Sequence, residues 1–366
     1  MSQRANSLTS LALQKFKRNF WGVLSLVYII LCGLAALFAY VIAPDSSENA
    51  NQMHLSIHSQ PPGFTVDILT IPSDLKMEQS FISRWFSGKI NSDTEIPITT
   101  YNLENDGITY TPYMSDGVVG LPKKVTINGV EDYNAFAKAY ISPRTFILGT
   151  DKYGRDLLSR MLIGARISFS IGFVAVFISL IIGLFMGSLA GYFGGKVDAA
   201  IMWIINVTWS IPTLLLVIAI TLALGKGYWQ VFIAVGLTMW VEVARVVRGQ
   251  VMGVKQMQYV TAARALGYTD GRIIVKHILP NVIAPLIVIS AANFAGAILI
   301  ESGLSFLGIG AQPPTPSWGA MIKDHYSYII LGKPYLAIIP GIAIMLLVMA
   351  FMLVGNALRD ALDVKN

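Results

Sequence analysis

The sequence predicts an all-α polytopic membrane protein with six transmembrane helices and a long extracytoplasmic insert, partly β, between the first two. Three observations predict this class. Hydrophobic residues make up 54% of the 366 residues and charged residues 13%, about half the charged share of a soluble domain. The apolar residues form runs of about twenty, the length of a helix that crosses a bilayer. Lys and Arg gather in particular loops, as a fixed membrane topology requires.

The first apolar run, WGVLSLVYIILCGLAALFAYVIA, has basic residues before it, as a signal peptide does. It is longer than a signal-peptide core and VIAPDSS is a poor cleavage site, so we expect a retained span. The spans are predicted at residues 21–42, 167–192, 199–224, 230–247, 282–303 and 335–357.

Positive charges in the short loops predict the orientation. With the N-terminus inside, thirteen Lys and Arg residues fall on the cytoplasmic side, against only Lys226, Lys323 and Lys333 in the short outer loops. Both termini are therefore expected in the cytoplasm. This orientation defines an N-terminal tail (1–20), the insert (44–147), a membrane core (148–357) with a cytoplasmic loop (248–281), and a C-terminal tail (358–366).

The insert differs in composition from the rest of the chain. Residues 44–165 carry a net charge of −4, and the remainder carries +10. The runs GFTVDILTIP and KKVTINGV predict short strands. His54 and His58 are expected to be exposed and have no third ligand nearby, so no metal site is predicted. The single Cys32 permits neither an internal disulfide nor a thiolate cluster.

Small residues and prolines mark the membrane core. Four glycines at four-residue intervals predict a helix-packing stripe. Asn206, Pro212 and Pro285 fit either the lining of a transport pathway or ordinary bundle geometry, because a proline kinks a helix and frees carbonyl groups. The glycines of the stripe are Gly183, Gly187, Gly191 and Gly195.

Catalytic chemistry is not indicated. The sequence shows no nucleophile–base arrangement and no H-E-x-x-H, so no catalytic residue is predicted. GGKVD is similar to the end of a phosphate loop, but Ala190 and Val197 replace residues that such a loop needs. We expect no cofactor on this chain. Its cations lie at span ends, which explains the net charge of +6 without nucleic-acid binding.

Two carboxylates lie in or near the predicted spans, Glu242 toward the cytoplasmic end of its span and Glu301. Each fits a proton relay or a structural, helix-end carboxylate, because charge in a membrane is costly and faces protein or water. Arg245 follows Glu242 by three residues and is a ready partner for it.

The stretch YVTAARALGYTDGRIIVKHILPN (259–281) predicts two short helices in the longest cytoplasmic loop. Gly267 is a good stop for the first helix, and Asp270 lies near the start of the second. The small alanine side chains allow a partner protein to approach the helix closely. Arg264 and Arg272 could bind acidic side chains or carbonyl groups of that partner.

This stretch resembles the coupling-loop motif of ABC importer permeases, in which Glu-Ala-Ala is followed by three residues, Gly, and a later Leu-Pro. Thr261 stands in place of the usual Glu and His277 in place of an Ile. The resemblance implies docking to an ATPase, and bulky replacements of Ala263 or Gly267 are expected to uncouple transport without unfolding. The predicted interface comprises Tyr259, Thr261, Ala262, Ala263, Arg264, Ala265, Gly267, Arg272, Leu279 and Pro280.

Two longer stretches, LGTDKYGRDLLSRMLIGARISFSIG and ESGLSFLGIGAQPPTPSWGAMI, resemble the C-type (second) permease of dipeptide, oligopeptide and nickel transporters. The resemblance covers residues 148–366 and FKRNFWG, but not most of the insert. It implies a type I ABC importer permease in the lipid of the bacterial cytoplasmic membrane. The implied partners are a B-type permease, two ATPase subunits that hold ATP and Mg, and an extracytoplasmic substrate-binding protein.

Peptides are the expected cargo, with nickel or another small solute as an alternative. An ATP-independent channel or proton-coupled carrier using Glu301 is a competing interpretation, and a membrane-anchored scaffold is a third. The spacing of the motifs does not distinguish import from export.

Overall fold

The computed structural model describes residues 8–73, 79–90, 93–104, 107–115, 118, 120–126 and 133–363. The outermost residues of both predicted tails lie outside these ranges. The chain forms two compact units. The membrane unit comprises Met1–Gly33, Ile167–Gln312 and Gly341–Asn366, and the insert unit comprises Leu34–Arg166 and Pro313–Pro340.

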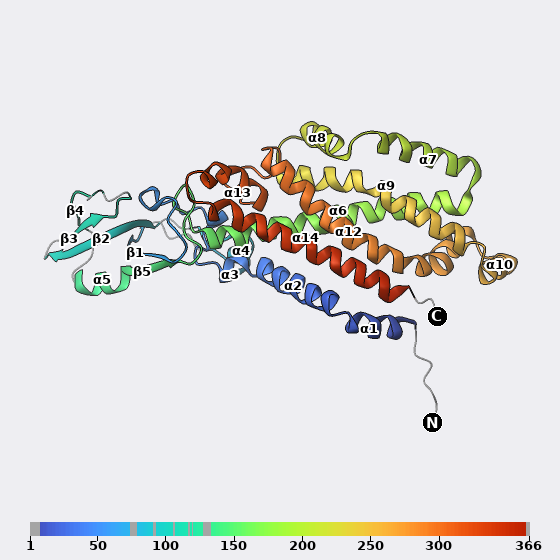
Figure 1. The fold of residues 1–366 in the computed structure, drawn as a ribbon, viewed down its shortest axis with the longest axis horizontal. Helices are drawn as coiled ribbons and strands as arrows, with labels where there is room; N and C mark the ends of the chain where they lie inside the picture. The colour runs from blue at the N-terminus through green and yellow to red at the C-terminus, as the bar shows by residue number, and fades with distance from the viewer. Residues whose placement is uncertain are drawn as a thin grey trace, which may run out of the picture. The chain divides into compact units, whose positions relative to one another are not determined.

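The described helices confirm the predicted class. Five of them are long and apolar enough to cross a membrane, and a sixth candidate is a bent helix pair. The predicted N-terminal tail contains a further helix, whose Phe16 packs against Ala357 and Ala361. The helices shown in Figure 1 include α1 (Leu8–Arg18), α2 (Phe20–Leu37), α3 (Ala39–Ile42), α6 (Leu157–Phe193), α7 (Gly195–Ser210), α8 (Thr213–Leu224), α9 (Tyr228–Val254), α12 (Leu279–Phe306), α13 (Trp318–His325), η4 (Tyr326–Ile329) and α14 (Tyr335–Leu362).

The bent pair replaces the single span predicted at residues 199–224. Helices α7 and α8 meet at 92°. The cause is Pro212, because a proline pushes the preceding residue out of the helical region, and Ile211 is extended (φ −92°, ψ 128°). Pro212 therefore divides the predicted span into two helices, whereas we expected it to kink a single helix.

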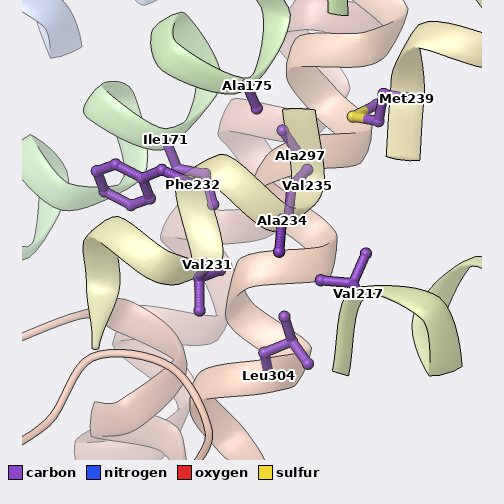
Figure 2. Packing of buried hydrophobic residues seen from close by; sticks show 10 residues of the cluster. All are labelled: Ile171, Ala175, Val217, Val231, Phe232, Ala234, Val235, Met239, Ala297 and Leu304. Atoms are coloured by element: carbon purple, nitrogen blue, oxygen red, sulfur yellow. The ribbon is translucent and has the colours of Figure 1, made fainter. Parts of the chain in front are cut away.

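The core of the membrane unit lies where four helices meet. Ile171 and Ala175 from α6, Val217 from α8 and Leu304 from α12 pack around the apolar face of α9 (Figure 2). Phe232 of α9 is fully buried in this cluster, so α9 is the central helix of the unit.

Three of the four predicted stripe glycines bring α6 against α9. A Cβ added at Gly187 would lie 2.4 Å from the Ala244 carbonyl oxygen, and one at Gly183 would lie 2.5 Å from Val243 Cβ. Gly191 approaches the Arg248 carbonyl oxygen in the same way. Gly195 is different: it begins α7 with a φ of +53° and has nothing within 4 Å. Its place in the stripe is wrong, because α6 ends before it.

The insert contains the predicted strands in one antiparallel sheet of order β4-β3-β2-β1-β5. Leu69, Ile98, Ile108 and Phe136 form its apolar core. The first three residues of KKVTINGV form a strand and Thr126 does not, while residues 127–130 lie outside the described ranges. The elements are η1 (Glu48–Ala50), η2 (Leu55–Ile57), β1 (Phe64–Ile71), α4 (Phe81–Ser87), β2 (Thr94–Glu104), β3 (Gly107–Pro112), β4 (Lys123–Val125), α5 (Tyr133–Tyr140) and β5 (Ile141–Phe146).

The two histidines of the insert have separate polar partners. His54 is buried, not exposed as expected, and its Nε2 lies 3.3 Å from Glu95 Oε2. Arg144 donates two hydrogen bonds to the same carboxylate, at 2.6 and 3.1 Å. His58 instead contacts the Ser115 hydroxyl. His54, the residue before η2, and Arg144 of β5 therefore both hold Glu95 of β2.

This cluster predicts a pH dependence of stability. Burial by itself raises the pKa of Glu95, but the hydrogen bonds from His54 and Arg144 outweigh it and lower the pKa to about 2. A carboxylate whose pKa is lowered in the folded state stabilises the folded state at any pH above its unfolded pKa. For Glu95 this stabilisation is about 3 kcal/mol, and it is lost as the pH falls from about 5 to 2.

Glu95→Gln should therefore lower the melting temperature of the purified protein at pH 6 and make little difference near pH 2. A gap between wild type and variant that stays constant across this range would contradict the assignment.

Candidate functional site

The candidate site begins with the segment between α9 and α12, which we call the connecting segment (residues 255–278). It contains α10 (Gln258–Ala265), α11 (Asp270–Ile273) and a π-helical turn, η3 (Ile274–Ile278). Figure 1 shows α10 beyond the ends of α9 and α12. The segment thus extends from the end of the helix bundle.

Gly267 closes α10 as predicted. Its φ of +77° is in the left-handed region, which glycine adopts without strain. The Tyr268 N–H donates to the Ala263 carbonyl at 3.2 Å, and the Gly267 N–H donates to the Arg264 carbonyl at 3.0 Å. These hydrogen bonds satisfy carbonyl groups at the helix end and fix the direction in which the chain leaves α10.

The second predicted helix is not separate from the span that follows. Residues Asp270–Phe306 run as one helical element of 37 residues, with Leu279 and Pro280 at the start of α12. Pro280 has no N–H and would crowd the carbonyl one turn earlier. The π-helical turn just before it, η3, accommodates this proline. Movement of α11 would therefore pass directly into α12.

One face of α10 is buried in the core of the membrane unit. Val260 and Ala263 are buried in a cluster with Val251 of α9, Ile273 of α11 and Val282 of α12. Ala263 was expected on the docking surface, and this is a correction: its side chain is only 4% exposed. An eight-residue helix with four small or apolar positions does not reveal from sequence alone which alanine points inward.

The opposite face of α10 is open. We call it the α10 surface. Leu266, which the sequence analysis did not single out, is 72% exposed at the end of the helix. The sequence carries no signal for Leu266, because its exposure follows from how α10 packs. The surface comprises Tyr259, Thr261, Ala262, Ala265 and Leu266.

Polar contacts fasten the connecting segment to the helix bundle. The Tyr192 hydroxyl of α6 donates to Asp270 at 2.5 Å, and Lys255 donates to the Tyr192 carbonyl. The two arginines predicted to meet a partner also have contacts within the chain. Arg264 approaches the Tyr192 hydroxyl at 3.5 Å, and Arg272 lies over the Tyr268 ring at 4.2 Å. Both remain exposed.

A second feature is a cavity of about 280 Å³ in the membrane unit, which we call the polar cavity. It lies beside the break between α7 and α8. Its lining comes from four helices: Thr208, Trp209, Thr213, Leu216, Thr238, Met239, Glu242, Ala292, Asn293, Gly296 and Ile300.

The structure separates the predicted pair Glu242 and Arg245. Arg245 lies over the Trp209 ring, 3.7 Å from its centre, and its Nη2 donates to Asn206 Oδ1 at 3.3 Å. Within the described residues no hydrogen bond or ion pair reaches the Glu242 carboxylate, and Glu242 is an exposed residue of the cavity lining. The expected partner of Glu242 is thus held by α7 instead.

Glu301, the other predicted carboxylate, is in a different environment. It is 1% exposed, and its Oε1 accepts a hydrogen bond from the Ser305 hydroxyl at 2.6 Å. Ser305 Oγ in turn accepts from the Ala311 N–H at 3.2 Å. These contacts join the end of α12 to the turn after it, and Glu301 does not line the polar cavity.

Residues 160–365 match the family of binding-protein-dependent transport system inner membrane components. Residues 7–62 match the N-terminal transmembrane domain of oligopeptide transport permease C.

Individual relatives match over a little more than half of this chain. The chain is 42% identical over 217 residues to a dipeptide transport system permease of Alkalihalophilus pseudofirmus, covering 59% of this chain and 71% of that protein. It is 43% identical over 217 residues to a glutathione transport system permease of Escherichia coli, with 59% and 71% covered. A chain of the MetNI methionine ABC transporter matches with 19% identity and a TM-score of 0.46, covering 55% and 95%.

Proposed function

The chain belongs to the family of binding-protein-dependent transport system inner membrane components, and we propose that it is one of two permease subunits of an ATP-driven peptide importer. It is a multi-pass membrane protein of this transporter family. The relatives named for dipeptide and glutathione transport support a peptide cargo. The proposed place is the bacterial inner membrane, with both termini in the cytoplasm.

The observation that carries the proposal is the two-faced helix α10. Its inner face is part of the core through Val260 and Ala263, and its outer face presents Ala262 and Leu266. Such a helix can sit in a groove of a second protein while remaining fixed to its own chain. Because α11 continues into α12, docking at α10 would move a membrane helix.

The partners follow from this arrangement. Two separate ATPase subunits would bind ATP and Mg, and closing on each other would push α10 between two positions. A B-type permease would complete the bundle, and an extracytoplasmic substrate-binding protein would deliver cargo at the insert. This chain would bind no nucleotide and catalyse no reaction. Ala262, Ala265 and Leu266 would contact the ATPase, with Tyr259, Thr261, Arg264 and Arg272 at the edge of the contact.

Co-purification tests the proposal. A tagged chain, gently solubilised from its native membrane, should bring down an ATPase and a second permease, identified by mass spectrometry. Leu266→Asp should lose the ATPase and keep the permease, because a carboxylate is disfavoured in an apolar groove. Recovery of the chain alone, still transporting in ATP-free vesicles, would contradict the proposal and favour an ATP-independent carrier.

A further inference from the structure

The polar cavity lies halfway along the membrane helices. Glu242 is near the middle of the 27-residue α9, and Asn293 is near the middle of the 28-residue α12. At about 1.5 Å per residue, each lies about 20 Å from either end of its helix. A cavity beside a broken membrane helix is where many membrane transporters place cargo sites.

The Glu242 carboxylate has no compensating partner in the described chain. A charged group at membrane depth is costly unless it faces water or a counter-ion. Arg245, the nearest cation in sequence, is held over Trp209 and by Asn206. The free carboxylate therefore gives the cavity a group that can accept hydrogen bonds from a cation.

Asn293 adds a free donor. Its residue is 3% exposed, and its Nδ2 has no hydrogen-bond partner among the described residues. Two threonines of the lining, Thr208 and Thr238, donate to the Ile204 and Val235 carbonyl oxygens at 2.9 Å, and neither hydroxyl accepts a hydrogen bond from the Asn293 amide. A buried amide without a partner is unfavourable, so an acceptor that enters the cavity would be stabilised there.

We propose that the polar cavity binds the N-terminal end of a peptide during transport. The Glu242 carboxylate accepts hydrogen bonds from the α-ammonium group, and Asn293 Nδ2 donates to the first carbonyl oxygen. This inference rests on the proposed peptide cargo. Leu216, Met239 and Ile300 supply apolar walls for a side chain without selecting one.

The residues that line the polar cavity do not favour nickel, the alternative cargo. A nickel ion prefers imidazole and other nitrogen ligands. The lining residues include neither His nor Cys. One carboxylate and one amide fit a peptide terminus better than a bare metal ion.

Uptake by the complete transporter, reconstituted in proteoliposomes with its binding protein and ATP, tests the inference. Radiolabelled alanyl-alanine is the probe. Glu242→Gln should reduce uptake about tenfold, the size of one charge-assisted hydrogen bond, and Glu242→Asp should recover most of it. Asp360→Asn makes a matched change at an exposed position near the end of α14 and should leave uptake unchanged. ATPase stimulation by the binding protein should persist in all three variants.

The outcomes are separable. Wild-type uptake in Glu242→Gln would overturn the inference and leave the proposed function intact. Equal loss in Glu242→Gln and Glu242→Asp would also overturn it, because charge would then not be the cause. Absence of peptide uptake by the wild type would overturn the peptide cargo itself.

A second measurement reads the charge of the cavity without any peptide. In a Cys32→Ser background, Thr213→Cys places a thiol in the lining. The cationic aminoethyl methanethiosulfonate should react faster than the anionic sulfonatoethyl reagent, and Glu242→Gln should lower this ratio about tenfold. An unchanged ratio would show that Glu242 does not select cations.

Discussion

Replacing Ala262 with tryptophan is expected to abolish transport without unfolding the protein. Ala262 is exposed on the α10 surface, so the bulky ring enters solvent in the isolated chain and alters the free energy of unfolding by less than about 0.5 kcal/mol. In the assembled transporter the ring would hold α10 out of the ATPase groove. We expect ATP-driven uptake to fall about a hundredfold, which corresponds to about 3 kcal/mol of docking energy.

The neighbouring residue provides a matched control. Ala263→Trp makes the same change on the buried face, where Val260, Ile273 and Ile278 leave no room for it. Overpacking a core costs about 1–3 kcal/mol, so the melting temperature should fall and the connecting segment should become sensitive to protease. Transport would then be lost through damage to the fold.

The pair of variants decides which face docks. Uptake assays in proteoliposomes and melting curves in detergent are needed for both. Normal uptake by a well-folded Ala262→Trp protein would exclude the α10 surface as the docking site. A fully stable Ala263→Trp protein would contradict the burial of that face.

Gly267 is a less informative site for this test than the sequence suggested. Nothing lies within 4 Å of its missing Cβ, but its φ of +77° strains any other residue. A Gly267→Trp protein would combine a local strain of about 1–2 kcal/mol with a new bulky group. Loss of transport could then have either cause, whereas Ala262 separates them.

The membrane helices and two strands of the insert were predictable because each depends on a local pattern, whereas the fold of the insert as a whole was not. Long apolar runs cross a bilayer whatever their neighbours do, and FTVDI, the first part of β1, alternates apolar and polar residues as a strand does. The bend at Pro212 was only partly predictable. A proline breaks the helix locally, but the 92° angle depends on how α8 packs against α9.

The site was less predictable, since its features come from residues far apart in sequence. Arg245 follows Glu242 on the same helix, yet its partners Trp209 and Asn206 lie on α7. The partner of Asp270 is Tyr192 on α6. Helical spacing gives the neighbours along one helix and says nothing of those that tertiary packing brings.

Replacing Gly187 with leucine is expected to have the largest effect on folding. The backbones of α6 and α9 approach so closely there that a single added Cβ would meet the Ala244 carbonyl oxygen at 2.4 Å and Val247 Cβ at 2.7 Å. Gly187→Ala alone should cost about 1–3 kcal/mol, because a backbone carbonyl cannot rotate away as a side chain can. Leucine requires α6 and α9 to separate, which destabilises the protein by more than about 1.4 kcal/mol. Since this energy is a factor of ten in an equilibrium, the yield of monodisperse protein in detergent should fall more than tenfold.

The matched control for this close contact is Gly249→Ala on α9. Nothing lies within 4 Å of its added Cβ, and alanine is the better helix former by about 1 kcal/mol, so this variant should be as stable as wild type or slightly more so. Size-exclusion profiles and melting temperatures of the three variants give the comparison. A Gly187→Leu protein with the wild-type profile would mean that α6 and α9 do not pack through these glycines. If only the Gly187 variants are destabilised, the α6–α9 contact is what keeps α9 in place. Helix α9 lines the polar cavity through Glu242 and leads directly into the connecting segment, so this one contact supports both sites.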